Sequence, residues 1–261
     1  MTRIYDCFPF FNETELLNFR INYLKEIVDY FVIVEADTTY SGLPKQQNFT
    51  CDLFDEATRK KIRYYYITYT EEAFVNDTFH MTSGEYKKAF QREEYQRDYL
   101  INGLFDAEAD DIILITDMDE IPNKHKLNRL LAVLLEKYSV LALEMHHFHG
   151  SVLNKTHMTT QPKMATYKNI KSRLSCITRS SMVGGIIKDA GWHFSYFGGA
   201  ERVNVKIRSE AHLEHTTGEN RKRIISDLKN RGVEYPLDNL PPLIFSPEFR
   251  SFFLPEEETA P

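Results

Sequence analysis

The sequence predicts an α/β fold in which a central, mostly parallel β-sheet is flanked by helices. Two observations support this class. Apolar runs of strand length recur along the chain, and segments whose apolar residues follow helical spacing separate several of them. A chain of 261 residues is also long enough to bury a full sheet with helices on both of its faces.

The first half of the chain alternates between strand and helix. Residues 4–11 predict an aromatic-rich first strand, and residues 13–28 predict a helix whose apolar face has a single break at Arg20. Residues 31–36 form a continuous apolar run typical of a buried strand, and a turn containing Gly and Pro follows. Residues 62–69 predict the third strand.

The alternation continues after residues 70–84, a polar segment that predicts a loop. Residues 85–104 have a strongly charged helical pattern, and residues 112–116 form a short apolar strand. An amphipathic helix over residues 127–135 and a strand over residues 140–148 follow. Consecutive β-α-β units of this kind favour a mostly parallel sheet.

We expect one catalytic domain over residues 1–235. From about residue 236 the chain is rich in Pro, and it ends in the acidic stretch EEETAP. Residues 236–261 therefore predict a tail that wraps the surface or frays.

The bulk composition narrows the choice of partners and compartment. A net charge of −6 points away from nucleic acid and anionic membranes. No apolar run approaches the roughly 20 residues that a membrane span requires, and the N-terminus lacks the apolar region of a signal peptide. The three cysteines are widely spaced and odd in number, which fits a reducing compartment. We therefore expect a cytoplasmic protein.

Acidic residues are concentrated directly after the strand at residues 112–116. Asp117 and Asp119 place both carboxylates on the same side of an extended segment, at the end of the sheet where ligands of parallel folds bind. Two carboxylates so close together favour a divalent, oxygen-preferring cation such as Mn²⁺ or Mg²⁺. Such a metal can neutralise charge on a leaving diphosphate. The alternative is a solvated acidic turn that caps the next helix.

Two arginines on the predicted helix over residues 85–104 offer positive charge for phosphate groups. Arg92 and Arg97 share one broad helix face with Glu93 and Gln96. Guanidinium groups suit bidentate contacts to phosphate oxygens. Taken alone, however, a solvated helix face with Glu–Arg pairs explains this pattern better.

A third group of candidates lies in residues 189–201, which contain the only Trp of the chain. Trp192 could stack on a sugar ring, and the alternative is a core aromatic residue. The Gly-Gly pair in this stretch allows close approach of the backbone to a ligand. Glu201 or Asp189 could act as a general base, with His193 as a further candidate.

Histidines provide two further options for metal binding. His212, close to His215, could supply a third ligand beside the Asp pair. In residues 144–150, His147 and His149 share one face of a predicted strand and could bind zinc. Because no third ligand stands out for that pair, we interpret the segment as the lining of a polar cleft.

Several of these stretches together resemble one known family. They are residues 4–13 with 30–45, residues 92–100, residues 111–122, and residues 190–201 with 206–215. In this order they resemble glycosyltransferase family 17, and the resemblance covers most of the chain, from residue 4 to residue 215.

The resemblance implies a GT-A fold with a Rossmann-like nucleotide-sugar half over residues 1–122 and an acceptor half over residues 123–235. It implies an inverting transfer of a sugar, N-acetylglucosamine in the family, from a UDP-sugar to a glycan or polysaccharide hydroxyl. It also implies Mn²⁺ or Mg²⁺ on the diphosphate.

The resemblance further implies roles for residues at the metal and at the reacting hydroxyl. Asp117 and Asp119 match the metal-binding pair of the family, and His212 falls where such enzymes often supply a C-terminal metal ligand. Glu201 falls at the expected place of the general base, with Asp189 or His193 as the next candidates.

Other residues are expected to hold the two substrates. The first strand, with Asp6 and Phe8, and Glu35 at the end of the second strand would hold the nucleobase and ribose. Arg92 and Arg97 would add positive charge at the phosphates. Trp192 would contact the acceptor.

Two other function classes stay open from the residues. A metal-dependent phosphoester hydrolase would use the Asp pair with His147 and His149, and a carbohydrate-binding protein would keep the fold without turnover. The intact Asp pair favours an enzyme. Vertebrate members of the family carry an N-terminal membrane anchor, whereas this chain starts at the first strand. We therefore expect a microbial or viral enzyme in the bacterial or host cytoplasm.

Overall fold

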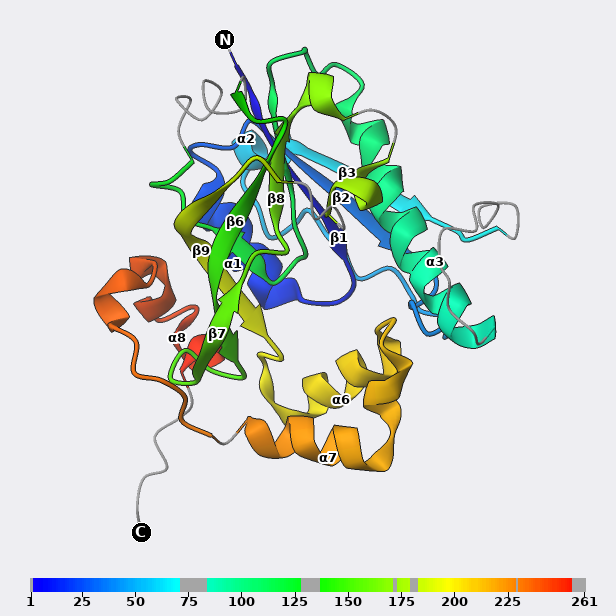
Figure 1. Ribbon diagram of the computed structural model, residues 1–261, viewed down its shortest axis with the longest axis vertical. Helices are drawn as coiled ribbons and strands as arrows, with labels where there is room; N and C mark the ends of the chain where they lie inside the picture. Colours follow the sequence, from blue (N-terminus) through cyan, green and yellow to red (C-terminus); the bar gives the residue numbers. More distant parts are fainter. Residues whose placement is uncertain are drawn as a thin grey trace.

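The computed structural model describes residues 2–70, 84–127, 137–170, 173–178, 183–228 and 230–254. These residues contain a nine-stranded sheet with the strand order β3-β2-β1-β4-β8-β6-β9-β5, and β7 pairs with β6 (Figure 1). The strands are β1 (Ile4–Phe10), β2 (Tyr30–Ala36), β3 (Ile62–Ile67), β4 (Ile112–Ile115), β5 (Glu120–Pro122), β6 (Val140–His149), β7 (Lys155–Thr159), β8 (Lys163–Thr166) and β9 (Gly185–Ser195).

Helices surround this sheet. The α-helices are α1 (Thr14–Leu24), α2 (Glu56–Arg59), α3 (Gly84–Tyr99), α5 (Leu174–Thr178), α6 (Gly199–Ser209), α7 (Gly218–Asp227) and α8 (Arg250–Phe253). The 3-10 helices are η2 (Leu100–Leu104), η3 (Tyr167–Asn169), η4 (Leu213–Thr216), η5 (Leu237–Asn239) and η6 (Pro242–Phe245). Among the described residues, no helix is long and apolar enough to cross a membrane.

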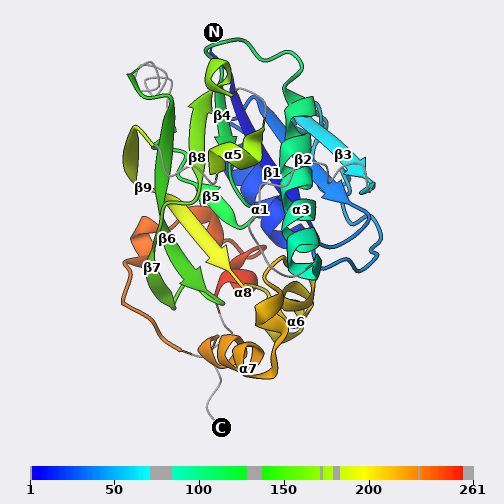
Figure 2. The same ribbon diagram turned by 45° about the vertical axis from the view of Figure 1, so that its right-hand side comes forward.

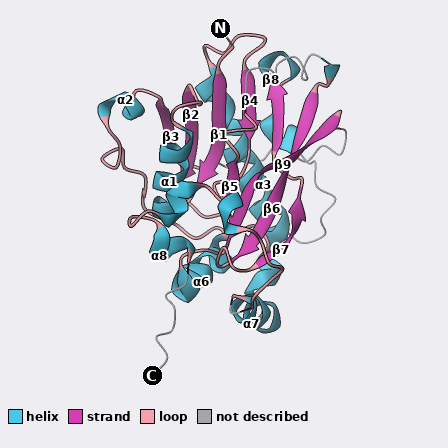
Figure 3. Ribbon diagram, turned by 90° about the vertical axis from the view of Figure 1, so that its left-hand side faces the viewer, coloured by secondary structure: helices cyan, strands magenta, loops and turns pink. Residues whose placement is uncertain are grey.

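The predicted α/β class is confirmed, and the N-terminal half of the sheet is parallel. β1 pairs in parallel with both β2 and β4, and β2 pairs in parallel with β3. The other half is mixed, because β8 runs antiparallel to β4 and β6 whereas β9 runs parallel to β6. Figure 3 shows β1 to β4 side by side, with β6, β7 and β9 continuing beyond them.

The elements predicted from apolar runs agree with the structure. Strands at residues 4–11, 31–36, 62–69, 112–116 and 140–148 correspond to β1, β2, β3, β4 and β6, and helices at 13–28 and 85–104 correspond to α1 and to α3 with η2. The predicted loop over 70–84 and helix over 127–135 lie almost entirely outside the described residues.

β5, β7, β8 and β9 were not predicted, because none of them has a long apolar run. β9 contains Gly191, which has a specific packing role. A Cβ atom there would lie 2.3 Å from the carbonyl oxygen of Ile121 in β5, so only glycine permits this close pairing.

Side chains on the two faces of the sheet form two separate clusters of the core. On one face, Phe8 and Phe10 of β1 pack with α1 residues such as Leu17. On the other face, Tyr5 and Cys7 pack with residues of η2 and α5. Figure 2 shows α3 in front of β1 and β2, with α1 behind them. This two-sided burial explains why β1 and β2 read as continuous apolar runs.

The segment predicted as a tail from residue 236 is part of the domain up to its last described residue. Phe249 and Phe253 are 2% and 0% exposed, and their rings lie 5.4 and 4.7 Å from that of Phe19 in α1. The expectation of a surface tail is corrected for residues 236–254, because the apolar side chains between the prolines pack into the main core. Residues 255–261 lie outside the described chain.

Candidate active site

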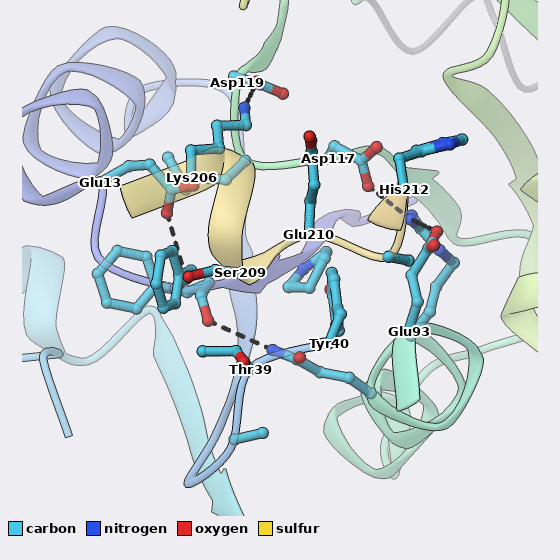
Figure 4. Close-up of a pocket in the computed structure, with 18 of the residues that line it drawn as sticks. Glu13, Thr39, Tyr40, Glu93, Asp117, Asp119, Lys206, Ser209, Glu210 and His212 are labelled. Carbon is cyan, nitrogen blue, oxygen red and sulfur yellow. Dashed lines mark hydrogen bonds and ion pairs between the residues drawn. The ribbon is translucent and has the colours of Figure 1, made fainter. Parts of the chain in front are cut away.

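A cavity of about 380 Å³ lies beyond the carboxyl ends of β1, β2 and β4. This is where the sequence places ligand binding in a parallel sheet. The walls come from the strand ends, from the loop after β2, from α3, and from α6 with the segment that follows it (Figure 4). Its charged groups, histidines aside, are Glu13, Glu93, Asp117, Asp119, Glu210, Lys45, Arg97 and Lys206.

The loop that carries Asp117 and Asp119 is held in place by Arg20. This arginine is fully buried, and it donates to the backbone carbonyl oxygens of Asp117 and Met118 at 2.7 and 3.1 Å. Its charge is balanced by Asp6, with Nη2 and Oδ1 2.6 Å apart. Arg20 is therefore an anchor of the acidic loop and not a defect in the apolar face of α1.

Asp119 is a buried carboxylate with two cationic neighbours. It is 6% exposed, its Oδ2 lies 2.5 Å from the Lys206 ammonium, and its Oδ1 lies 3.4 Å from Nε2 of His193. Burial alone would raise the pKa of Asp119, but the Lys206 and His193 charges outweigh it and hold that pKa well below its usual range. Figure 4 shows Lys206 reaching Asp119 from α6.

Asp117 is paired with a different cation. Its Oδ1 lies 2.6 Å from Nη2 of Arg97, which also lies 3.2 Å from Glu93 one helical turn earlier in α3. Burial by itself lowers the pKa of Arg97, but these two carboxylates raise it above its ordinary value. Arg97 and Lys206 therefore place one cation beside each member of the Asp pair.

Glu120 and His193 lie behind the Asp pair, in β5 and β9. Burial and the neighbouring charge of Asp117 raise the pKa of Glu120 to about 7. The Glu120 carboxylate accepts a hydrogen bond from the backbone N–H of Asp117 at 2.7 Å. Burial lowers the pKa of His193, but the Asp119 carboxylate outweighs that effect and raises it. The base of the loop is thus densely polar.

Five of the residues to which the sequence analysis gave a catalytic, metal-binding or substrate-binding role line this cavity: Arg97, Asp117, Asp119, His193 and His212. His212 is not gathered with the two Asp residues as a third ligand. Within the described residues, its ligand atom lies within 4.8 Å of those of Glu214 and His215 instead. Asp117, Asp119 and His212 nevertheless line the same cavity, and the role of His212 as a metal ligand stays a prediction.

Three residues expected at the nucleoside lie outside the cavity lining. Asp6 and Phe8 are fully buried, and the guanidinium of Arg20 lies 4.0 Å from the centre of the Phe8 ring. Glu35 is also fully buried, and its carboxylate accepts hydrogen bonds from the backbone N–H groups of Asn48 and Phe49 at 2.8 and 3.0 Å. These side chains support the walls from behind, which corrects the expectation of direct contact.

Arg92 and Trp192 also act away from the cavity. Arg92 donates to the backbone carbonyl oxygen of Tyr40 at 2.9 Å, and Tyr40 lines the cavity. Trp192 is 3% exposed within the main core, and its indole N–H donates to the hydroxyl of Tyr235 at 3.4 Å. The core alternative for Trp192 is correct, since a buried indole offers no face to an acceptor.

Two of the expected bases are not in the cavity. Glu201 is exposed in the first turn of α6 and is not part of the lining. The side chain of Asp189 is 64% exposed, and its Oδ1 lies 3.1 Å from Nε2 of His146. The lining of the cavity therefore does not support either residue as the base, whereas His193, the third candidate, does line it.

The histidines of the hydrolase alternative do not join the Asp pair. The His147 ring packs between those of His193 and His157, at 4.6 and 4.3 Å. Nε2 of His149 lies 3.3 Å from the backbone carbonyl oxygen of Ile224. Neither His147 nor His149 lines the cavity, and neither belongs to a metal-ligand group within the described residues. Within the described residues, His147 and His149 therefore do not form a zinc site with the Asp pair.

Several lining residues were not found from the sequence. Lys206, Glu210 and Tyr196 come from the C-terminal side of β9, and Glu13 comes from the start of α1. One available signal was the amphipathic pattern of α6, in which Val203 and Ile207 are buried. The fold alone brings Lys206 to Asp119, 87 positions earlier in the chain.

Comparisons with known proteins give a consistent result. A family model described as glycosyltransferase family 17 matches residues 1–229. The chain is 24% identical over 233 residues to proteins from Rattus norvegicus and Homo sapiens, each named β-1,4-mannosyl-glycoprotein 4-β-N-acetylglucosaminyltransferase. The match includes 76% of this chain but 41% of each relative, so the chain spans about two fifths of the length of the curated relatives it matches.

Proposed function

Since the chain belongs to glycosyltransferase family 17, we propose that it transfers a sugar from a UDP-sugar to a hydroxyl of a glycan, with inversion at the anomeric carbon. N-acetylglucosamine is the sugar we propose, because the relatives are named for its transfer. We also propose a GT-A arrangement, in which the parallel strands β3-β2-β1-β4 form the nucleotide-sugar half.

The observation that carries this proposal is the composition of the cavity at the strand ends. It gathers the Asp pair with three cationic side chains, Lys45, Arg97 and Lys206, at the place where nucleotides bind in parallel sheets. A diphosphate needs cations, and a nucleoside needs apolar and hydrogen-bonding surface beside them. Phe10, Phe11, Thr38 and Thr39 supply that second kind of surface at the ends of β1 and β2.

The donor set also fits an oxygen-preferring divalent ion. Five carboxylates and three cationic groups line the cavity, which is a formal excess of two negative charges before any histidine is protonated. A diphosphate adds further negative charge, so an additional cation favours its entry. We propose that Asp117 and Asp119 hold Mn²⁺ or Mg²⁺. When bound, the ion would neutralise charge on the leaving diphosphate.

Side chains of this chain supply the other parts of the reaction. Arg97 and Lys206 orient the diphosphate oxygens as fixed positive charges. The acceptor oxygen forms a bond to the anomeric carbon while the bond from that carbon to the diphosphate breaks. The diphosphate leaves with the electron pair, and the hydroxyl proton passes to a carboxylate of the cavity wall.

We assign that carboxylate to Glu13. Each of the other four lining carboxylates already contacts a cationic or imidazole group, since Glu93 and Asp117 contact Arg97, Asp119 contacts Lys206 and Glu210 contacts His215. Glu13 instead accepts backbone N–H bonds from Phe11 and Asn12 through Oε2, at 3.2 and 3.1 Å. These bonds fix its position at the cavity wall, near Lys206 but outside the ion pair of Lys206 and Asp119 (Figure 4).

Calorimetric titration with UDP, GDP and CMP tests the donor site. We expect UDP to bind in the presence of Mn²⁺. The UDP Kd should rise by about tenfold or more after chelation of the metal or after Asp119→Asn. The matched control is Asp110→Asn, because Asp110 pairs with Lys168 at the surface, with its side chain 66% exposed. Absence of nucleotide binding under all conditions would contradict the proposal.

A further inference from the structure

A second cavity, of about 670 Å³, lies where the start of α6 meets the end of α7 and α8. Its walls include Ser151 after β6, Gly198 and Gly199 before and at the start of α6, Leu228 after α7, and Ser251 of α8. Cavities of about 300–1,000 Å³ hold ligands larger than one small ring. The donor chemistry proposed above does not use this space.

A small space lies between the second cavity and the first, and we call it the passage. It is a space of about 20 Å³ whose lining overlaps with both neighbours. Glu13, Asp119 and Lys206 line the passage and the first cavity, whereas Arg202 and Phe252 line the passage and the second cavity. Tyr196 lines all three spaces, so the two cavities adjoin at this residue, with room for about one water molecule between them.

The backbone at Tyr196 supports a functional role for this junction. Tyr196 has φ = 59°, a left-handed conformation that a bulky residue rarely adopts. Backbone strain of this kind is concentrated at functional sites. The hydroxyl of Tyr196 donates to Glu210 at 3.2 Å, so the surrounding structure holds the ring at the passage.

The lining of the second cavity matches the chemistry of sugars. The partly buried ring of Phe252 lines the cavity and supplies apolar surface for the C–H groups of a sugar. Glu15 and Glu248 offer acceptors for hydroxyl groups, and Arg202 offers donors while it pairs with Glu15 at 2.7 Å. Two carboxylates against one guanidinium disfavour an anionic ligand, so a neutral saccharide fits best.

The Gly-Gly pair also supports ligand binding in the second cavity. Gly198 and Gly199 have φ values of 93° and 85°, and a Cβ atom built on Gly199 would meet no atom within 4 Å. The backbone there is open to a ligand, as the sequence predicts for this pair. A ligand that approaches this backbone would lie in the second cavity, because Gly198 and Gly199 line that cavity and not the cavity with the Asp pair.

We propose that the second cavity binds a neutral oligosaccharide acceptor, whose reacting hydroxyl lies at the Tyr196 end of the cavity and faces the side on which Glu13 lies. This assignment rests on the proposed transferase function, and it names where the acceptor lies relative to the donor. The position of Glu13 is also a second argument for its role as the base, because its side chain lines both the donor cavity and the passage.

A pair of tryptophan substitutions on α8 tests the proposal. Ser251 is exposed and lines the second cavity, so Ser251→Trp fills it. Arg250 is exposed on the same helix and does not line the cavity, so Arg250→Trp is the matched control. The probe is β-1,4-mannotriose, titrated calorimetrically into the protein loaded with UDP and Mn²⁺, and UDP is titrated separately.

We expect the mannotriose Kd to rise about tenfold or more in Ser251→Trp, with the UDP Kd unchanged within about twofold in both variants. Glu248→Gln removes a carboxylate of the second cavity without adding bulk, and we expect it to weaken mannotriose binding with no effect on UDP. Equal mannotriose affinity in Ser251→Trp and Arg250→Trp would overturn the proposal. So would competition between mannotriose and UDP, or tighter binding of the acidic trisaccharide sialyllactose.

The two proposals fail in different ways. If the wild-type protein binds UDP but not mannotriose, the acceptor assignment is wrong and the donor site stands. If the wild-type protein does not bind UDP, the transferase function itself is contradicted, and the acceptor assignment falls with it.

Discussion

The buried pair of Asp6 and Arg20 gives the sharpest prediction about how the fold holds the acidic loop. Both side chains are 0% exposed, and two contacts join them: Nη2 to Oδ1 at 2.6 Å and Nε to Oδ2 at 2.9 Å. Arg20→Met leaves the Asp6 carboxylate buried without its cation, which costs about 3–5 kcal/mol. For a domain of this size, the melting temperature should fall by about 6–20 °C.

A double-mutant cycle separates the ion pair from the role of Arg20 at the loop. Asp6→Leu combined with Arg20→Met replaces the pair by apolar groups, and such replacements are often neutral or stabilising. The double variant still leaves the carbonyl oxygens of Asp117 and Met118 without their donor, at about 1 kcal/mol each. We therefore expect it to be more stable than Arg20→Met alone, yet to bind UDP more weakly than the wild type.

Urea unfolding followed by circular dichroism measures the four free energies of the cycle. The matched control is Lys60→Met, because Lys60 and Glu56 form a surface pair at 2.8 Å with side chains 74% and 85% exposed. That change should cost less than about 1 kcal/mol. A cost for Arg20→Met as small as that of the control would refute the reasoning, as would a double variant whose loss equals the sum of the single losses.

Three further predictions concern the catalytic base, the core and the pH dependence of stability. Glu13→Gln should abolish sugar transfer while UDP binding persists, whereas Glu201→Gln should retain transfer because Glu201 lies outside the cavity; a steady-state assay giving the reverse order would return the base to Glu201. Trp192→Ala should lower the free energy of unfolding by about 3–5 kcal/mol, measured in urea, because Trp192 is 3% exposed in the core; a loss under about 1 kcal/mol would contradict core burial. Hydrogen bonds from Arg63, against a smaller opposing effect of burial, hold the pKa of Asp106 at about 2, below its ordinary value of 3.8. The lowered folded-state pKa means that this stabilisation is present above pH 4 and is lost as the pH falls toward 2. In acid melts over that window, Asp106→Asn should therefore show a shallower loss of stability than the wild type, and parallel curves would argue against the pairing.

Short-range patterns in the sequence were sufficient for much of the fold. β1, β2 and β4 are buried on both faces, so their continuous apolar runs identify them without knowledge of their partners. The position of Asp117 and Asp119 follows from the same pattern, because they come directly after β4 and ligands bind at that end of a parallel sheet.

The rest of the site depends on contacts between distant parts of the chain. Lys206 reaches Asp119 across 87 positions, and Arg20 reaches the carbonyl oxygen of Asp117 across 97 positions. No local pattern marks either contact, so Arg20 resembles a break in an apolar face. Trp192 was misinterpreted in the other direction. A lone Trp near a Gly-Gly pair resembles a residue that stacks on a sugar, but this Trp is buried and its indole N–H donates to the hydroxyl of Tyr235.

The most direct test of the central claim is product analysis with the purified protein, UDP-N-acetylglucosamine, Mn²⁺ and β-1,4-mannotriose. We expect UDP as the nucleotide product and an extended glycan with a β linkage, since inversion of an α-linked donor gives a β-linked product. Asp119→Asn should form neither product, while Asp110→Asn should form both. Release of UMP or inorganic phosphate without an extended glycan would contradict the account, and so would an unchanged rate in Asp119→Asn.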